Sequence, residues 1–163
     1  MIVVNNLFTP EFRNNLIEEL QPLLLDGSTM ATFYNINARI PGRQTHGTLH
    51  LHPNFKEVLE SITEHVTSYV RKNVKISKMW GLWINGKKED MNWHDHSPND
   101  YSAIYYLKVP PFIRNGTLFE ERGLVRVDEN SLLIFPSNLK HTSPSYFWKG
   151  DRYTISADFR YDK

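Results

Sequence analysis

The sequence contains no cysteine, and this absence removes several classes of site at once. Disulfide frameworks, zinc–thiolate centres and cysteine nucleophiles are all excluded. A chain without cysteine is also consistent with a reducing compartment, so we expect a cytoplasmic protein.

Strong net charge and long apolar runs are absent too. The formal net charge is only +1, so no large electrostatic field draws the chain to nucleic acid or to an anionic membrane. No apolar run approaches the roughly 20 residues needed to cross a bilayer, and the N-terminus lacks the basic region and apolar run of a signal peptide. We expect neither nucleic acid nor membrane as a partner, whereas the choice between monomer and homodimer stays open.

What the chain does contain is enough for one globular unit. Its 163 residues are 40% hydrophobic and 13% aromatic, which is typical of a folded domain rather than a disordered segment. A chain of this length favours one domain, and no internal repeat, low-complexity tract or linker interrupts it. We therefore expect a single domain over residues 1–163.

Helical patterns are confined to the N-terminal part of the chain. Thr9 and Pro10 supply an N-cap and a proline at the first helical position. Apolar residues at spacings of three and four follow as far as Gly27, where the predicted helix ends. A second helix, whose apolar stripe predicts packing against a sheet, is expected from Asn54. The intervening residues 28–53 are expected to be irregular.

From Lys78 onward the pattern changes to short apolar and aromatic runs separated by turn residues. Such spacing predicts the strands of a sandwich or barrel-like β fold. A further short strand is expected over residues 1–5, and the other predicted strands are 79–85, 101–109, 117–119, 124–127, 131–135 and 153–159. The expected fold class is therefore mainly β with N-terminal helices.

Two histidine-containing segments stand out. Residues 92–96 (Asn-Trp-His-Asp-His) precede a predicted strand, and His141 follows another. In an extended segment side chains alternate, so His94 and His96 point the same way and Asp95 the other. An antiparallel sandwich can return His141 beside them, and three protein ligands leave open positions on a metal. Imidazole binds Fe, Zn, Cu and Ni alike, so the residue types alone do not name the metal.

Arg152 lies on the last predicted strand. A guanidinium holds a carboxylate through two parallel hydrogen bonds. An arginine beside a metal site is therefore suited to anchor a dicarboxylate that also chelates the metal. Tyr106 and Ser156 offer hydroxyl groups to the same carboxylate.

The chain carries a second pair of histidines at the same spacing, His50 and His52. This pair precedes a predicted helix and has no downstream histidine and arginine at strand spacing. We interpret it as structural or surface, as we do His46 in the same loop. His65 falls between apolar positions of the second helix and is interpreted as a boundary residue.

Together these motifs resemble the 2-oxoglutarate/Fe(II)-dependent oxygenase family, and within it a small prolyl-hydroxylase-like branch of bacteria and phages. The similarity covers about residues 40–160. It rests on the motifs N-x-H-x-H at 92–96, S-A-x-Y-Y at 102–106 (where the branch has S-G-x-Y-Y), F-P-S-x-x-x-H at 135–141 and the arginine at 152. The resemblance implies a double-stranded β-helix, or jelly roll, flanked by two helices.

The resemblance also implies a function and a role for each site residue. The expected enzyme holds Fe(II) and couples oxidative decarboxylation of 2-oxoglutarate by O2 to hydroxylation of an unknown substrate, with a prolyl or other peptide residue as one candidate. His94 and His141 match the family's histidine ligands, and His96 stands where the wider superfamily has a carboxylate. Arg152 matches the residue that pairs with the far carboxylate of 2-oxoglutarate. Residues that match others helping to hold this co-substrate are Tyr106 and Ser156.

The third metal ligand is open at this point. Strand alternation favours His96, but a bend at residues 97–98 can turn Asp95 inward instead. A histidine here leaves the iron one charge more positive than the usual two-histidine, one-carboxylate triad does.

Two other functional hypotheses remain beside this one. The chain is alternatively a jelly-roll three-histidine metalloenzyme that does not use 2-oxoglutarate, or an inactive binding or structural module of the same fold. Four aromatic residues near the motifs either line a substrate entrance or, as we favour, belong to the sheet and its core: Trp83, Trp93, Tyr101 and Tyr105.

Overall fold

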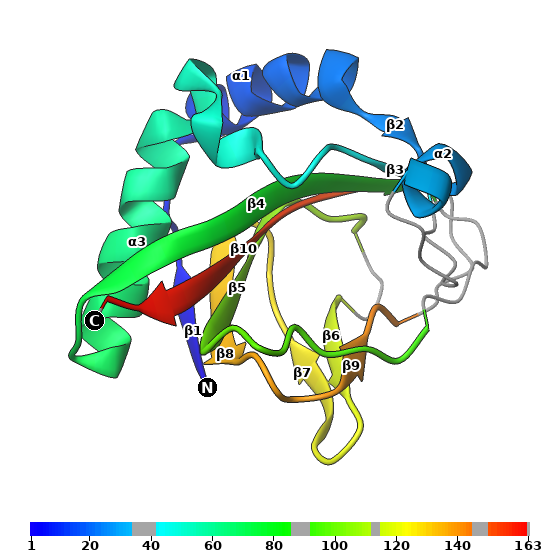
Figure 1. Ribbon diagram of the computed structural model, residues 1–163. Coiled ribbons are helices and arrows are strands. Elements are labelled where there is room, and N and C mark those ends of the chain that lie inside the picture. The colour runs from blue at the N-terminus through cyan, green and yellow to red at the C-terminus, as the bar shows by residue number, and fades with distance from the viewer. Residues whose placement is uncertain (34–41, 86–91, 112–114, 145–149, 163) are drawn as a thin grey trace.

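The computed structural model of the chain describes residues 1–33, 42–85, 92–111, 115–144 and 150–162 (Figure 1). Its first helix, α1 (Pro10–Leu20), begins at Thr9, whose side-chain oxygen accepts a hydrogen bond from the backbone N–H of Phe12. The helix ends before the predicted boundary at Gly27 because Pro22 cannot continue the hydrogen-bond pattern of an α-helix. The chain continues as the 3₁₀ turn η1 (Gln21–Leu23).

Two more helices complete the described N-terminal part. α3 (Lys56–Val70) starts close to the predicted position, after the 3₁₀ turns η2 (Leu49–Leu51) and η3 (Pro53–Phe55). α2 (Gly27–Phe33) lies in a segment predicted to be irregular, so that prediction is wrong for residues 28–33. Its first turn is supported by Asp26, whose Oδ1 accepts a 2.9 Å hydrogen bond from the backbone N–H of Ser28.

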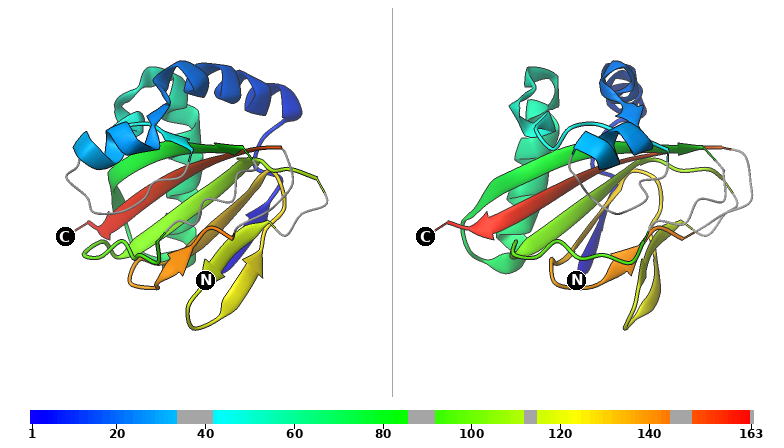
Figure 2. Two further views of the ribbon diagram at one scale, coloured as in Figure 1. Left: turned by 90° about the vertical axis from the view of Figure 1, so that its right-hand side faces the viewer. Right: turned by 45° about the vertical axis from the view of Figure 1, so that its right-hand side comes forward.

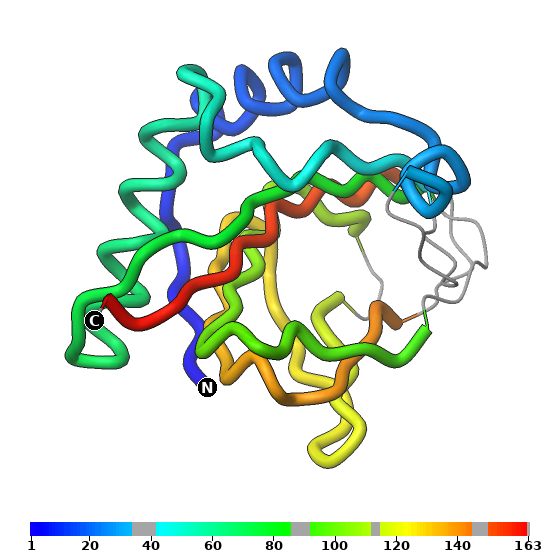
Figure 3. Tube along the Cα trace, viewed as in Figure 1, coloured from blue at the N-terminus to red at the C-terminus, as the bar shows by residue number. Residues whose placement is uncertain are grey.

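Two antiparallel sheets form the body of the molecule. The larger sheet has, in spatial order, β1 (Ile2–Asn5), β8 (Ser131–Pro136), β5 (Tyr101–Lys108), β10 (Asp151–Tyr161), β4 (Val74–Asn85), β3 (Arg43–Gln44) and β2 (Leu25–Asp26). The smaller sheet has β7 (Gly123–Arg126), β6 (Gly116–Phe119) and β9 (His141–Thr142). The trace in Figure 3 shows that β4 and β10, far apart in sequence, run side by side.

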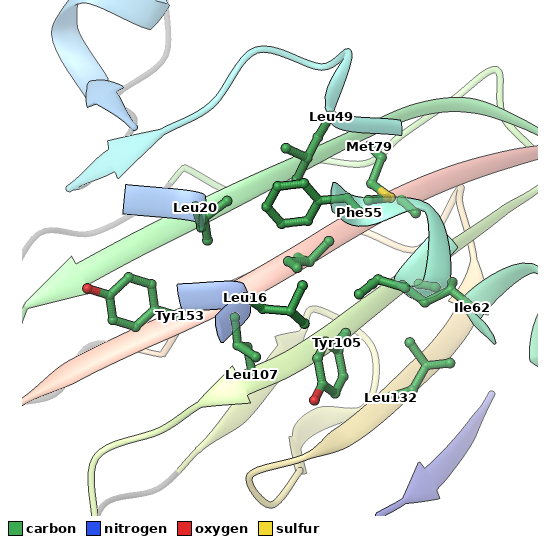
Figure 4. Close-up of a cluster of buried hydrophobic side chains, with 14 of the residues drawn as sticks. Leu16, Leu20, Leu49, Phe55, Ile62, Met79, Tyr105, Leu107, Leu132 and Tyr153 are labelled. Atoms are coloured by element: carbon green, nitrogen blue, oxygen red, sulfur yellow. The ribbon is translucent and has the colours of Figure 1, made fainter. Parts of the chain in front are cut away.

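The larger sheet separates two layers. Helices α1 and α3 cover its outer face, and the smaller sheet lies on the opposite side (Figure 2). The outer face buries a large apolar cluster, which includes Leu16, Leu20, Phe55 and Ile62 from the helical layer (Figure 4). A smaller apolar cluster lies on the other side, with Phe119 of β6 among its members.

Strand β10 shows how the sequence assigns residues to the two faces. Four alternate residues belong to the cluster on the helix side: Tyr153, Ile155, Ala157 and Phe159. The residues between them face the smaller sheet and are polar, namely Arg152, Thr154, Ser156 and Asp158. The predicted fold class, mainly β with N-terminal helices, is confirmed. No helix in the described ranges is long and apolar enough to cross a membrane.

Candidate metal centre

The backbone holds the two histidine segments together. His94 and His141 exchange both backbone hydrogen bonds, with N···O distances of 3.1 and 2.9 Å. Two residues later, the N–H of His96 donates to the carbonyl of Ser137 at 2.8 Å. The loop before β5 is therefore tied to the segment that runs from Ser137, after β8, to His141, the first residue of β9, and this pairing brings three imidazoles to one place.

The three imidazoles form a cluster with metal-site dimensions. One ring nitrogen from each of His94, His96 and His141 lies within 4.8 Å of the other two, the only such group of metal-binding side chains among the described residues. The ring centroids are 4.5 to 5.3 Å apart. Three nitrogens at this separation can share one ion.

Hydrogen bonds decide which ring nitrogens are available. The Nδ1 of His94 contacts the carbonyl oxygen of Asn92, and the Nδ1 of His141 that of Leu139, each at 2.8 Å. The Nδ1 of His96 contacts a carboxylate oxygen of Asp158 at 2.6 Å. Because these oxygens are acceptors, each Nδ1 carries the proton and each Nε2 keeps its lone pair. In its neutral form, each ring therefore offers the same atom, Nε2, to an ion.

Burial keeps the rings of His94 and His141 in the state that binds metal. His141 is 3% exposed and His96 9%. Desolvation, with a smaller contribution from neighbouring histidines, lowers the pKa of His141 to about 3. Burial also lowers the pKa of His94. Both are neutral at neutral pH, and neutral imidazole is the ligand form, so the donor set fits a divalent transition metal.

Asp95, the alternative third ligand, lies apart from this cluster. Its side chain is exposed, and its Oδ1 accepts a 2.9 Å hydrogen bond from the backbone N–H of Ser97. That bond lowers the pKa of the Asp95 carboxyl. The structure thus brings His96, and not Asp95, to His94 and His141, as strand alternation favours.

A carboxylate that sequence reasoning missed lies directly behind the cluster. Asp158 is fully buried on β10 and contacts the His96 ring from the side opposite Nε2. The signal was present in the sequence, because Asp158 continues the alternate series that contains Arg152 and Ser156. Trp80, also missed, lies with its ring centroid 5.3 Å from that of His96.

Arg152 is buried at the other end of the inner face of β10. It is 4% exposed, and its Nη2 donates to the carbonyl of Gly116 at 3.0 Å. Its Nε has no hydrogen-bond partner among the residues that the structure describes. No carboxylate in the described ranges lies within ion-pair distance of it. A buried guanidinium with an unused donor fits an anionic ligand.

Polar groups surround this guanidinium. Its carbon lies 5.3 Å from the centroid of the Tyr106 ring. The Tyr106 hydroxyl contacts Thr117 Oγ1 at 2.5 Å, and burial raises the pKa of Tyr106, so it stays a neutral hydroxyl. Ser156 is 8% exposed on the same face of β10 as Arg152.

Strand β6 connects the arginine with the histidines. Gly116, at one end, accepts the hydrogen bond from Arg152, and Phe119, at the other, pairs with His141. Three residues of strand rise separate these two points by roughly 10 Å. A five-carbon dicarboxylate chelated to a metal at one end can bridge such a distance.

The remaining aromatic and histidine candidates lie elsewhere. Trp83, Tyr101 and Tyr105 pack on the helix side of the larger sheet, as the core interpretation expects. Trp93, beside His94, is 46% exposed. The other His-x-His pair lies in and after η2 and is not part of the cluster. The Nδ1 atoms of His50 and His52 are buried and have no hydrogen-bond partner in the described part of the chain.

Comparison with solved structures identifies the fold. The chain matches HygX from Streptomyces hygroscopicus with nickel and 2-oxoglutarate bound, with a TM-score of 0.70 and 14% identity over 98% of this chain and 82% of HygX. It matches a Trichoplax adhaerens prolyl hydroxylase in complex with a hypoxia inducible factor peptide, with a TM-score of 0.69 and 15% identity over 98% and 82% of the two chains. A viral collagen prolyl hydroxylase from Paramecium Bursaria Chlorella virus-1 gives a TM-score of 0.64 and 10% identity over 99% and 90%.

These matches extend over nearly the whole chain, and they show a shared fold at low sequence identity. The chain therefore has the double-stranded β-helix of 2-oxoglutarate/Fe(II) oxygenases, which confirms the fold that the resemblance implies. No protein-family model and no curated protein matches the sequence.

Proposed function

We propose that this chain, as a single domain, is a non-haem Fe(II) dioxygenase that uses 2-oxoglutarate as co-substrate. One juxtaposition supports the proposal above all. One ring nitrogen from each of three histidines lies within 4.8 Å of the other two at one end of β6, and a buried arginine whose Nε–H has no partner among the described residues lies at the other end. The first group suits a metal, and the second suits the far carboxylate of a chelating dicarboxylate.

His94, His96 and His141 would hold the metal through Nε2. Their Nδ1 hydrogen bonds fix the ring orientations before the metal arrives, so little reorganisation accompanies binding. Fe(II) bound by these three histidines would supply the oxygen activation that side chains cannot perform.

Arg152 would hold the distal carboxylate of 2-oxoglutarate. A carboxylate here would use the Nε–H, which has no hydrogen-bond partner among the described residues, and would neutralise a buried charge. Tyr106 flanks the guanidinium, and Ser156 lies on the same face, so both hydroxyls are placed to add contacts. The overall reaction converts substrate C–H, 2-oxoglutarate and O2 into C–OH, succinate and CO2.

Apolar residues shield one side of the metal centre. The rings of Phe119 and Phe135 lie 5.7 and 4.9 Å from the His141 ring, and both belong to the buried cluster between the sheets. These rings offer water no hydrogen-bond partner on that side of the site. Substrate must then approach from the more open side, where Trp80 and the exposed Trp93 lie near His96 and His94.

The substrate is proposed only as a class. Two of the structures with this fold are prolyl hydroxylases, so a prolyl or other peptide residue is the first substrate to test. This step rests on analogy, because one fold carries many activities.

Anaerobic titration with Fe(II) and 2-oxoglutarate tests the proposal. The expected result is the visible charge-transfer band of an Fe(II)–2-oxoglutarate chelate, followed by succinate formation when O2 is admitted. Arg152→Ala should weaken the 2-oxoglutarate titration. Arg160→Ala is the matched control, because Arg160 is exposed on the same strand and bonds only to Asn99 among the described residues.

The three-histidine donor set also favours a second candidate function. A jelly-roll metalloenzyme without 2-oxoglutarate would use the same imidazoles and leave Arg152 without a role in catalysis. Bound iron without the band and without succinate would support that enzyme. A protein that binds no metal at all would instead be an inactive module of the fold.

A further inference from the structure

Asp158 makes more polar contacts than any other buried side chain near the cluster. Its Oδ1 receives hydrogen bonds from His96 Nδ1 at 2.6 Å and from the Ser102 hydroxyl at 2.7 Å. Its Oδ2 lies 3.3 Å from Asn99 Nδ2 and 3.5 Å from Lys78 Nζ. Both oxygens therefore have partners within the protein, and Asp158 is not part of the group whose donor atoms lie within 4.8 Å of one another.

Such a carboxylate is costly unless it serves the site. Asp158 is 0% exposed, and its one lysine or arginine partner in the described ranges, Lys78, has a side chain that is 51% exposed and an Nζ 3.5 Å from Oδ2. An apolar residue here would avoid the desolvation of a charge. The shortest of the four contacts goes to the ring of a proposed metal ligand, which places the charge where it acts on that ring.

The three histidines differ in the group that accepts the hydrogen bond from their Nδ1–H. His94 and His141 donate to neutral backbone carbonyls within their own segments, whereas His96 alone among the three donates to a carboxylate. His96 also occupies the position where the wider superfamily has a carboxylate ligand. The three histidine ligands carry no negative charge, but the Asp158 carboxylate, hydrogen-bonded to one of them, supplies one just outside the ligand set.

We propose that Asp158 is a positioning residue that fixes His96 with Nε2 toward the metal and returns to the centre the negative charge of the missing carboxylate ligand. A carboxylate on Nδ1–H raises the electron density of the imidazole and strengthens it as a ligand. The inference deepens the proposed function, because it rests on a metal bound at the three histidines.

The experiment combines two measurements on the full chain. Nitrogen-detected NMR of the histidine rings in the metal-free protein reads the tautomer of His96, which we expect to be entirely Nδ1–H. Calorimetric titration with Ni(II), a redox-inert probe, then reads the metal affinity. The variants are Asp158→Asn, which removes the charge and keeps an acceptor, and Asp158→Ala, which removes both. Asp162→Asn is the control, because Asp162 is exposed and pairs with Lys75.

The expected pattern is specific. Asp158→Asn should weaken Ni(II) binding by about 10- to 100-fold, as loss of such outer partners generally does. Asp158→Ala should weaken it further and release His96 into a mixture of tautomers, a change that a purely structural carboxylate would not produce. Asp162→Asn should bind as the wild type does.

Two outcomes separate this inference from the proposed function. Wild-type protein that binds Ni(II) with the same affinity as Asp158→Asn would overturn the role of Asp158 and leave the metal site standing. Wild-type protein that binds no Ni(II) would overturn the proposed function. A His96 ring in the Nε2–H form in the metal-free wild type would overturn the inference whatever the metal affinity.

Lys78→Met gives a test that does not require Asp158 to be altered. Removing the partly exposed ammonium leaves the carboxylate with less compensation, so Ni(II) should bind about two- to fivefold more tightly, the size expected of an exposed pair. Unchanged or weaker binding in a folded Lys78→Met protein would contradict the proposed charge effect, even if the Asp158 variants do not fold.

Discussion

The two faces of the larger sheet are built from the same strands but have opposite compositions. On β10, the side chains under α1 and α3 are apolar or aromatic, whereas those facing the smaller sheet carry an arginine, a carboxylate and two hydroxyls. Both sets are buried, most of them below 5% exposure. The outer face buries apolar surface, and removing that surface from water stabilises the fold. The inner face buries polar groups, which lowers stability unless a ligand uses them.

The largest expected effect comes from the outer face. Phe55 projects from η3 into the helix-side cluster with 0% exposure. Phe55→Ala should lower the free energy of unfolding by about 3–5 kcal/mol through lost burial and a cavity, as measured by urea denaturation. Protein that remains folded should keep its Ni(II) affinity.

Leu51→Ala is the matched control for this change, because Leu51 is apolar, lies just before η3 and is 72% exposed. Its unfolding free energy should stay within about 0.5 kcal/mol of wild type. Equal losses in the two variants would mean that the outer face does not supply the stability assigned to it.

A smaller loss of unfolding free energy is expected at Gly116, a residue that affects both stability and the binding of 2-oxoglutarate. Gly116 has φ +135, and a Cβ there would lie 1.9 Å from the carbonyl oxygen of Val125. Gly116→Ala should cost about 1–3 kcal/mol, and it should also weaken 2-oxoglutarate binding, because the Gly116 carbonyl holds Arg152. Denaturation and calorimetry measure the two losses.

Gly123→Ala separates backbone strain from these contacts. Gly123 also has positive φ, at 71, but its added Cβ would meet nothing within 4 Å. It should lose about 1 kcal/mol and keep full 2-oxoglutarate binding. Loss of binding in this variant would show that β6 and β7 respond as one unit rather than through the Arg152 contact.

A substitution on the inner face should have the opposite effect to Phe55→Ala, with stability kept and ligand binding lost. Arg152→Met replaces a buried cation with an apolar chain, so the free energy of unfolding should stay within about 1 kcal/mol of wild type. Binding of 2-oxoglutarate should fall below detection in calorimetry. A loss above about 2 kcal/mol would assign Arg152 to the core instead of to a ligand.

The smallest effect at neutral pH, and one that grows with acid, is expected from His141. Its pKa is held at about 3 in the folded metal-free protein, whereas the unfolded chain has an ordinary value near 6.5. As pH falls below about 6.5, the unfolded state binds the proton first, so stability declines progressively toward pH 3. Thermal unfolding of metal-free protein across this range measures the decline, which His141→Asn should reduce. An unchanged slope in His141→Asn would assign the acid sensitivity to other groups.

Some elements of the fold can be predicted from the local pattern of the sequence. The apolar spacings located α1, α3 and the principal strands, although β4 begins earlier than predicted, at Val74. The i and i+2 spacing correctly placed His94 and His96 on one side of their segment. α2 was missed because its short apolar pattern is weak and because Asp26, which supports its first turn, fell inside the predicted first helix, which was expected to run to Gly27, whereas α1 ends at Leu20.

The sequence by itself determined which residues share a face, because side-chain direction follows from the period of the strand. It paired Arg152 with Ser156 and His94 with His96, and without cysteine it confined the metal-binding candidates to histidine and carboxylate. The tertiary structure decided which face each set occupies. Pairing of residues 94 and 141 brought the imidazoles together. The hydrogen bond from Ser97 holds the Asp95 carboxylate away from that cluster, at the surface. Strand β10 placed the Asp158 carboxylate against the Nδ1 of His96. Those contacts join segments distant in sequence, and local periodicity carries no information about which distant segments meet.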